Sequence, residues 1–243
     1  MTAWYEKSFG EDYIRVYRHR NRQDAKKEIE AVSRWLELKP QEKVLDLCCG
    51  TGRHSISLQK MGYQVTGVDL SPALLSVAEK TSQGLGIEYI RGDMRSLPLA
   101  SANFDAVVNL FTSFGYFVED TDNRRVLEEI NRVLKPSGRF LVDFLNREAV
   151  KKNLVPRSER EEDGIWILEE RWIEGDFVHK LIRLRDEKGE RTYQERVKMY
   201  KREQMEEMMV STGLKVENVH GDFEGNPYLE KESPRMIFRG RRL

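Results

Sequence analysis

Three aspartates follow apolar, strand-like runs in the first half of the chain, and glycines follow the first of them. Asp46 precedes Gly50 and Gly52, Asp69 ends the next apolar run, and Asp93 follows the third. Glycines directly after a buried strand let a ligand approach the backbone, and the next helix offers N–H groups and the positive end of its dipole. The pattern predicts a binding site for a nucleotide-like ligand.

Two common phosphate-binding motifs do not fit the residues around Gly52. A mononucleotide P-loop needs a lysine directly after its last glycine, and none follows Gly52 closely. The dinucleotide fingerprint needs a third glycine where Ser55 stands, although Asp69 occupies the position that would hold a ribose hydroxyl. An NAD-dependent oxidoreductase therefore stays an alternative. The carboxylate of Asp46 would repel a pyrophosphate and would suit a ligand with an ammonium group.

S-adenosyl-L-methionine is such a ligand, and the stretch Asp-Leu-Cys-Cys-Gly-Thr-Gly at 46–52 resembles the first motif of the class I S-adenosylmethionine-dependent methyltransferases. Gly-Val-Asp-Leu-Ser at 67–71 is similar to their acidic second-strand end, and Arg-Gly-Asp-Met at 91–94 to their third-strand motif. The resemblance covers most of residues 40–145 and the last thirty residues. It implies a methyltransferase that uses this cofactor.

The resemblance also implies a role for each matching residue. Asp46 would face the methionine amino group, and the two glycines of the turn would let the cofactor near the backbone. Asp69 would bind the ribose hydroxyls, Asp93 with the amide of Met94 would read the adenine edge, and Leu70 would pack on the ring. Arg53 would either reach the methionine carboxylate or face solvent. The predicted cofactor-binding residues are Asp46, Gly50, Thr51, Gly52, Arg53, Asp69, Leu70, Asp93, Met94 and Leu110.

Acceptor-facing residues are predicted after the fourth strand and in the N-terminal run. Methyltransferases that modify amines of DNA bases, or glutamine amides, commonly carry Asp/Asn-Pro-Pro-Phe/Tyr after this strand, whereas residues 109–112 read Asn-Leu-Phe-Thr. Similarity to small-molecule methyltransferases instead suggests that Thr112, Ser113 and Tyr116 face substrate. The basic, aromatic run 13–20 either closes over the site or forms a solvated helix face. The predicted catalytic residues are Tyr17, His19, Tyr116 and Asn146, with Arg20 as a further candidate.

Alternating strand-like and helix-like segments predict the fold that positions these residues. The rhythm indicates an α/β, doubly wound, Rossmann-like sheet of seven mostly parallel strands with an antiparallel last strand. Ligands bind at the carboxyl ends of the strands in such sheets. Strands are expected at 44–48, 63–68, 87–90, 104–110, 139–145, 215–223 and 235–241, and helices at 22–38, 53–61, 73–81, 123–134 and 202–211.

Strand-like stretches also interrupt this pattern late in the chain. Three of them, between Ile165 and Tyr200, are separated by short Gly-containing loops and predict a small antiparallel β insertion. His179 is expected to pack within it. We expect an N-terminal helical cap at 1–38, a cofactor-binding domain at 39–150 and 201–243, and an insertion at 151–200 that serves as a substrate lid or a contact in a homodimer.

The composition of the chain limits the classes of function, partner and location that we expect. The 41 basic residues balance the 41 acidic ones, so nucleic acid is not an expected partner. Without a membrane-spanning run or a signal-peptide h-region, a cytoplasmic protein is expected. The adjacent Cys48 and Cys49 favour neither a disulfide nor a metal site. The sequence therefore predicts methyl transfer to nitrogen or oxygen of a small molecule, with an RNA or protein methyltransferase or a non-enzymatic cofactor-binding protein as alternatives.

Overall fold

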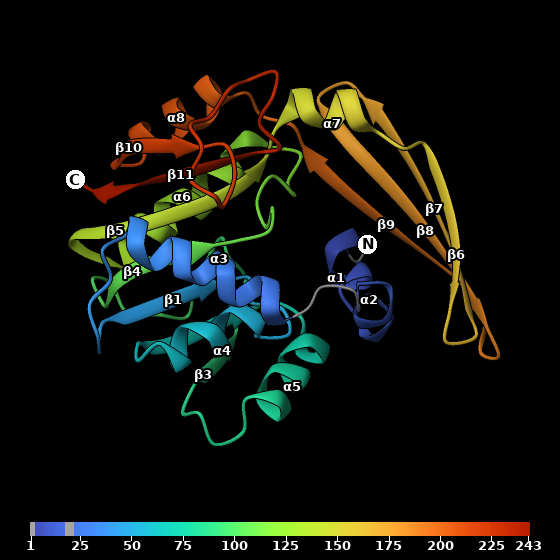
Figure 1. The fold of residues 1–243 in the computed structure, drawn as a ribbon, viewed down its shortest axis with the longest axis horizontal. Helices are drawn as coiled ribbons and strands as arrows, with labels where there is room; N and C mark the ends of the chain where they lie inside the picture. The colour runs from blue at the N-terminus through green and yellow to red at the C-terminus, as the bar shows by residue number, and fades with distance from the viewer. Residues whose placement is uncertain (1–2, 18–21) are drawn as a thin grey trace.

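The computed structural model describes residues 3–17 and 22–243, and a seven-stranded sheet forms its centre (Figure 1). Its strands are β1 (Lys43–Leu47), β2 (Gln64–Asp69), β3 (Glu88–Arg91), β4 (Phe104–Asn109), β5 (Leu134–Leu145), β10 (Leu214–His220) and β11 (Arg235–Arg242). Their order is β10-β11-β5-β4-β1-β2-β3. The first five strands run parallel, and β11 pairs antiparallel with both β5 and β10. The predicted fold class is confirmed.

Helices cover both faces of this sheet because the buried strands are apolar on both sides. The helices are α3 (Arg22–Trp35), α4 (Arg53–Lys60), α5 (Pro72–Thr81), α6 (Asp120–Val133) and α8 (Arg202–Ser211). In β1, Val44 joins the core cluster that contains residues of α3 and α4, whereas Leu45 and Leu47 join the cluster under α6 and α8. Successive residues of a strand point to opposite faces of the sheet, so β1 contributes to the helical layer on each face.

Two short helices that the sequence pattern did not predict lie beside the carboxyl edge of the sheet. They are α1 (Trp4–Ser8) and α2 (Glu11–Val16), between the large sheet and a second sheet (Figure 1). Helix α3 packs instead on the core, where Ile29 and Val32 are fully buried. We infer that an N-terminal cap comprises α1 and α2, and that α3 belongs to the central α/β unit.

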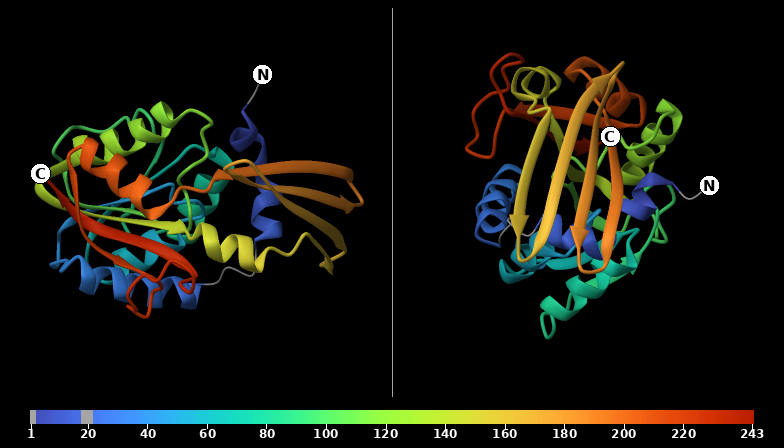
Figure 2. Two further views of the ribbon diagram at one scale, coloured as in Figure 1. Left: turned by 90° about the horizontal axis from the view of Figure 1, so that it is seen from above. Right: turned by 90° about the vertical axis from the view of Figure 1, so that its right-hand side faces the viewer.

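The second sheet consists of four antiparallel strands and projects from the large sheet (Figure 2). Helix α7 (Arg147–Asn153) leads into β6 (Arg157–Glu162), β7 (Ile165–Glu174), β8 (Phe177–Asp186) and β9 (Gly189–Lys198). We call these four strands the inserted sheet. The expectation of three strands was wrong: β6 reads Arg-Ser-Glu-Arg-Glu-Glu, which has no apolar alternation to reveal it. His179 stacks on Trp172 with ring centroids 5.0 Å apart, as a packed histidine.

Candidate active site

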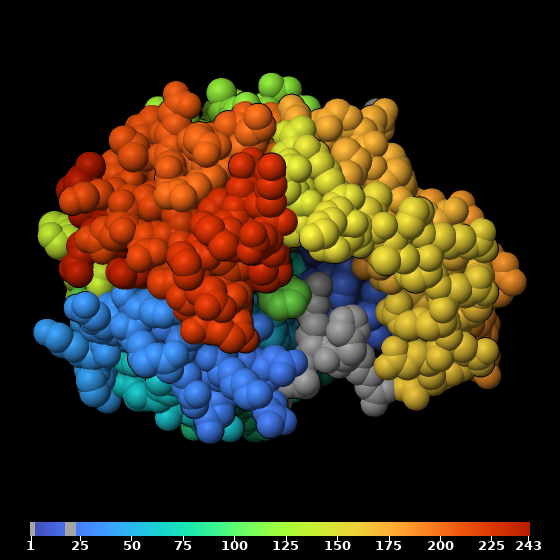
Figure 3. Space-filling model, turned by 45° about the horizontal axis from the view of Figure 1, so that its top comes forward, coloured from blue at the N-terminus to red at the C-terminus, as the bar shows by residue number. Residues whose placement is uncertain are grey.

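A cavity of about 1120 Å³ lies between the carboxyl edge of the large sheet and the inserted sheet. Figure 3 shows the hollow between the body of the molecule and the inserted sheet, drawn in yellow. A recess of about 80 Å³ adjoins it. Both are lined by residues of α1 and α2, of the turn after β1 and of the loop after β4; the shared residues are Phe9, Tyr13, Cys48, Gly50, Ser113 and Tyr116.

Eight of the ten residues predicted to bind the cofactor line these two hollows. The residues that line the cavity come from the turn after β1 and the end of β4. The residues that line the recess come mainly from the ends of β2 and β3. Thr51, Arg53 and Leu110 line the cavity, Asp69, Leu70, Asp93 and Met94 line the recess, and Gly50 lines both. The parallel strands bring them together because their carboxyl ends share one edge of the sheet.

Asp69 is fixed at the edge of the recess by two backbone amides. One carboxylate oxygen accepts the N–H of Gly50 at 2.8 Å, and the other accepts the N–H of Ser71 at 2.9 Å. Burial raises the pKa of the Asp69 carboxyl, although these hydrogen bonds oppose the shift. Each oxygen retains acceptor capacity, so the carboxylate can bind a diol while it orders the turn.

Asp93 is held by Arg95, which no motif in the sequence indicated. Arg95 Nη2 donates to Asp93 Oδ2 at 2.7 Å, and the guanidinium lies 4.4 Å from the centroid of the Phe117 ring. Burial acts to raise the pKa of Asp93, but the hydrogen bonds from Arg95 outweigh it and the pKa is lowered. The carboxylate is therefore charged and oriented at neutral pH.

Asp46 lies beneath the Gly-rich turn and lines neither hollow. It is 1% exposed, and its Oδ2 accepts a hydrogen bond from Ser55 Oγ at 2.6 Å. Burial raises the pKa of its carboxyl, against the influence of His54, Ser55 and Arg53. The predicted contact of Asp46 with the methionine amino group, directly or through water, stays a prediction. We propose that Asp46 acts through its charge and by tying the turn to α4.

Different structural constraints favour glycine at the two glycine positions of the turn. Gly50 has φ +56°, and a Cβ there would have no heavy atom within 4 Å. Gly52 has φ +76°, and its Cβ would lie 2.4 Å from the Tyr89 hydroxyl and 3.0 Å from Cβ of Ala78. Gly52 therefore packs tightly against Tyr89 and Ala78, and its role in the close approach of a cofactor stays a prediction.

This difference predicts unequal costs for the two alanine substitutions. Gly52→Ala should lower the free energy of unfolding by about 2 kcal/mol, because backbone strain adds to a steric clash. Gly50→Ala, the matched control, should cost about 1 kcal/mol, since only backbone strain applies. Urea unfolding at pH 7 measures both. Equal losses would show that Tyr89 moves aside and that packing does not require Gly52.

Arg53 and His54 open α4 at the cavity wall, and one carboxylate from α3 binds both. Glu28 Oε2 lies 3.2 Å from Arg53 Nη1 and 2.7 Å from His54 Nε2. The Arg53 guanidinium also lies 4.6 Å from the centroid of the Phe111 ring. Arg53 therefore faces the cavity rather than bulk solvent. His54 and Glu28 were not predicted, because the helix that carries Glu28 shows only its apolar period in the sequence.

The loop after β4 is held by an ion pair between a fully buried carboxylate and a partly exposed arginine, neither of which was predicted. Phe111 and Thr112 have positive φ angles of 65° and 60°. Asp143, which is fully buried in β5, accepts the Phe111 N–H at 2.8 Å and a hydrogen bond from Arg235. Arg235 also donates to Thr112 Oγ1 at 2.8 Å. A charged residue in the otherwise apolar Phe-Leu-Val-Asp-Phe-Leu was the available signal.

Tyr116 is one of the predicted catalytic residues that the structure places in the cavity. Its ring contacts Trp4 and Phe9, with centroids 5.2 and 5.7 Å away. Burial raises the pKa of Tyr116 well above that of an ordinary phenol, so the hydroxyl stays protonated at neutral pH. Ser113, also in the wall, donates its hydroxyl to the Leu110 carbonyl at 2.9 Å. These side chains are suited to shaping the site rather than to removing a proton.

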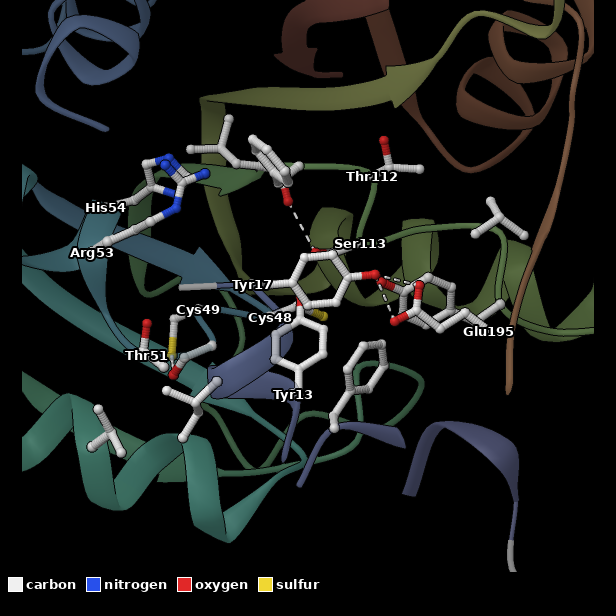
Figure 4. Close-up of a pocket in the computed structure, with 18 of the residues that line it drawn as sticks. Tyr13, Tyr17, Cys48, Cys49, Thr51, Arg53, His54, Thr112, Ser113 and Glu195 are labelled. Atoms are coloured by element: carbon white, nitrogen blue, oxygen red, sulfur yellow. Dashed lines mark hydrogen bonds between the residues drawn. The ribbon is translucent and has the colours of Figure 1, made fainter. Parts of the chain in front are cut away.

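Tyr17 reaches across the cavity to the inserted sheet (Figure 4). Its hydroxyl lies 2.8 Å from both carboxylate oxygens of Glu195 and accepts a hydrogen bond from Lys180 Nζ at 2.8 Å. Glu195 lies on β9, and no motif singled it out. The pair joins residues 178 positions apart in the chain, a separation that no local pattern in the sequence reveals.

Behind Tyr17, one carboxylate of the inserted sheet binds three cations. Glu169 is 5% exposed and lies 2.5 Å from Lys180, 2.6 Å from Arg171 and 3.1 Å from Arg160. Burial acts to raise the pKa of Glu169, but these cations outweigh it and lower the pKa to about 2. The pKa of Lys180 is lowered, because burial outweighs the attraction of the carboxylates.

The lowered pKa of Glu169 predicts a pH-dependent contribution to stability. A carboxyl whose folded pKa is depressed stabilises fully above its unfolded pKa of about 4.5 and stops doing so as the pH falls towards 2. We expect Glu169→Gln to cost about 2 kcal/mol at pH 7, after the burial cost of Lys180 is set against the gain. Urea unfolding should show that this difference shrinks at pH 3. The exposed Glu161→Gln is the control, and a difference that stays constant with pH would contradict the assignment.

Two predicted catalytic residues are not placed in the cavity. Asn146 caps α7, where its side chain accepts the Glu148 N–H at 3.1 Å and donates to the carbonyls of Glu230 and Ser233. It lines a separate recess of about 20 Å³, so we propose no contact between Asn146 and substrate. His19 and the neighbouring Arg20 lie outside the described residues.

Neither a metal-binding cluster nor a membrane-spanning helix is found in the described ranges 3–17 and 22–243. No group of three or more His, Cys, Asp or Glu side chains there is placed to hold a metal ion. No helix there has the length and apolar character needed to cross a membrane. Both cysteines are free, and Cys48 lines the cavity and the recess.

Comparison with known proteins agrees with this arrangement. A family model described as a methyltransferase domain matches residues 44–138. The putative methyltransferase YqeM of Bacillus subtilis (strain 168) is 30% identical over 223 residues, which cover 86% of this chain and 89% of YqeM. The demethylmenaquinone methyltransferase of Thermotoga maritima is 41% identical over 109 residues, and the match spans 44% of each chain.

Solved structures share the fold over nearly the whole length. An S-adenosylmethionine-dependent methyltransferase from Clostridium acetobutylicum superposes with a TM-score of 0.79 and 21% identity, over 94% of this chain and 95% of that one. CalS10, an amino pentose methyltransferase from Micromonospora echinaspora solved with S-adenosylmethionine bound, gives a TM-score of 0.71 and 22% identity, over 96% and 97% of the two chains. The inserted sheet therefore lies within a shared architecture.

Proposed function

The chain belongs to the S-adenosylmethionine-dependent methyltransferases, and on that premise we propose that it methylates nitrogen or oxygen of a small molecule bound in the cavity. One observation carries the proposal: the recess lined by the predicted cofactor residues adjoins a cavity of about 1120 Å³ that the inserted sheet borders. That volume is ample for the methionyl end of the cofactor and a small acceptor together.

The recess suits the adenosine part of the cofactor. Asp69 offers carboxylate oxygens for a ribose diol, and Leu70, Met94 and Phe117 offer apolar surface for a ring. Asp93 stands at the same recess with its charge held by Arg95. The chemistry of these donors fits S-adenosylmethionine. In the cavity, we assign Thr51 and Arg53 to the methionine end.

The residues of the chain contribute mainly position and exclusion of water. When bound, the cofactor would supply an electrophilic methyl group on a sulfonium, which an acceptor nitrogen or oxygen would take as the thioether leaves. Trp4, Phe9 and Tyr116 form an aromatic wall that excludes water from this part of the cavity. Further along the same row of rings, the Tyr17 hydroxyl and Glu195 orient polar atoms of the acceptor.

A small acceptor is favoured by the relatives and by the shape of the site. One relative is a demethylmenaquinone methyltransferase, and one structural neighbour is an amino pentose methyltransferase. The acceptor side of this cavity is bordered by α1, α2 and the inserted sheet. We propose that these elements form a lid over the substrate, which leaves less room for a macromolecule.

Binding and labelling experiments test the function. Calorimetry should show that S-adenosylhomocysteine binds and that NADH does not; tight binding of NADH alone would contradict the proposal. Incubation with methyl-labelled S-adenosylmethionine should transfer label into a metabolite extract but not into total RNA or denatured cell protein. Label found only in RNA or protein would favour the alternative class of methyltransferase.

A further inference from the structure

The basic side chains of the cavity wall are paired with carboxylates, whereas its acidic side chain is not paired in this way. Among the described residues that line the cavity, Glu195 is the only one with a carboxylate. Each basic side chain of the wall is already bound by a carboxylate that lies outside the lining. Arg53 and His54 are bound by Glu28, Arg171 by Glu169, and Arg235 by Asp143.

Glu195 is not neutralised in the same way. Its carboxylate oxygens accept one hydroxyl, that of Tyr17, and each has capacity for another donor. Lys180 attracts Glu195 from a distance, but its ammonium contacts Glu169 at 2.5 Å and the Tyr17 hydroxyl at 2.8 Å. Lys180 does not line the cavity. Of the charges of Glu195 and Lys180, that of Glu195 is therefore the one that a ligand in the cavity meets.

Aromatic rings continue from this carboxylate along the cavity wall. Tyr17 and Tyr13 lie 4.5 Å apart between centroids, Tyr13 and Phe9 5.0 Å, and Phe9 and Tyr116 5.7 Å. The faces of such rings attract cations. The Tyr17 ring already does so, since Lys180 Nζ lies 4.6 Å from its centroid.

We propose that the acceptor is an amine that binds in its cationic form, with its ammonium group against Glu195 and beside the aromatic rings that follow it along the wall. This inference rests on the proposed function and specifies its substrate class. The positive charge is attracted to Glu195, the one carboxylate among the described residues of the wall, and to the ring faces, an attraction that needs no N–H group. Before methyl transfer, an acceptor ammonium passes one proton to the Glu195 carboxylate, which leaves the nitrogen lone pair free to attack the methyl carbon. A carboxylate-bearing acceptor would meet that anion and be repelled. Glu195 thereby selects amines over alcohols of the same shape.

A pair of molecules with the same shape and different charge tests the proposal. Choline and its neutral isostere 3,3-dimethylbutan-1-ol are titrated by calorimetry into the whole protein saturated with S-adenosylhomocysteine. We expect choline to bind at least tenfold more tightly than the isostere. Glu195→Gln, which keeps the shape of the side chain, should abolish this preference. Glu190→Gln, on the exposed end of the same strand, should retain it.

The outcomes separate this inference from the proposed function. Choline that does not bind, binds no better than the isostere, or keeps its preference in Glu195→Gln would overturn the amine assignment. Binding of S-adenosylhomocysteine should be the same in Glu195→Gln as in the wild type, which also shows that the variant folds. If S-adenosylhomocysteine fails to bind the wild-type protein, the proposed function itself fails.

Discussion

Replacement of Asp69 by alanine is expected to weaken binding of S-adenosylhomocysteine about a hundredfold, or about 2.7 kcal/mol. The substitution removes the carboxylate that we assign to the ribose hydroxyls, and hydrogen bonds to a charged group contribute about 1.5–3 kcal/mol each. It also leaves the N–H groups of Gly50 and Ser71 without their acceptor, so the turn that borders both hollows loses its support. Calorimetry with the purified variant measures the change.

Two further variants identify the cause of such a loss. Asp69→Asn keeps one oxygen acceptor without the charge and should bind with intermediate affinity. Glu88→Ala changes an exposed carboxylate at the opposite end of the neighbouring strand β3 and should bind as the wild type does. Affinity of Asp69→Ala within threefold of the wild type would show that Asp69 does not contact the cofactor.

Asp143→Ala should lower the free energy of unfolding by about 3–5 kcal/mol, the largest loss expected for a single substitution at this site. Removal of one partner from a buried ion pair leaves the other charge uncompensated. Here the change also frees the Phe111 N–H, while the left-handed backbone of Phe111 and Thr112 retains its strain. Chemical unfolding at pH 7 provides the measurement.

An exposed ion pair gives the contrast. Asp105 contacts Lys135 at 2.7 Å on the surface, and Asp105→Ala should cost less than about 1 kcal/mol. The double variant Asp143→Leu with Arg235→Met removes both charges and should recover part of the loss of Asp143→Ala. If Asp143→Ala proves no more costly than Asp105→Ala, the ion pair does not hold the loop.

Local pattern was sufficient for the large sheet and for part of the cofactor site. Helix α5 begins at Pro72, one residue before the predicted start, and Ser71 caps it, because Ser71 Oγ accepts the Leu74 N–H at 3.2 Å. The strand β6 was not predicted because five of its six residues are charged and the sixth is a serine, which leaves no apolar side to bury. A regular spacing of apolar residues indicates which side of a strand or helix faces the core, but it cannot indicate a strand that has no apolar residues.

What the sequence determined by itself was the family, the fold class and the edge of the sheet at which Asp69 and Asp93 meet. Parallel strands have their carboxyl ends at the same edge of a sheet, so residues that directly follow neighbouring strands lie close together. Tertiary structure decided which side of each backbone faces the hollow: it placed Asp46 beneath the turn and Asn146 at a distant cap. It also brought Glu195 to Tyr17, because contacts between remote segments depend on packing that has no trace in local spacing.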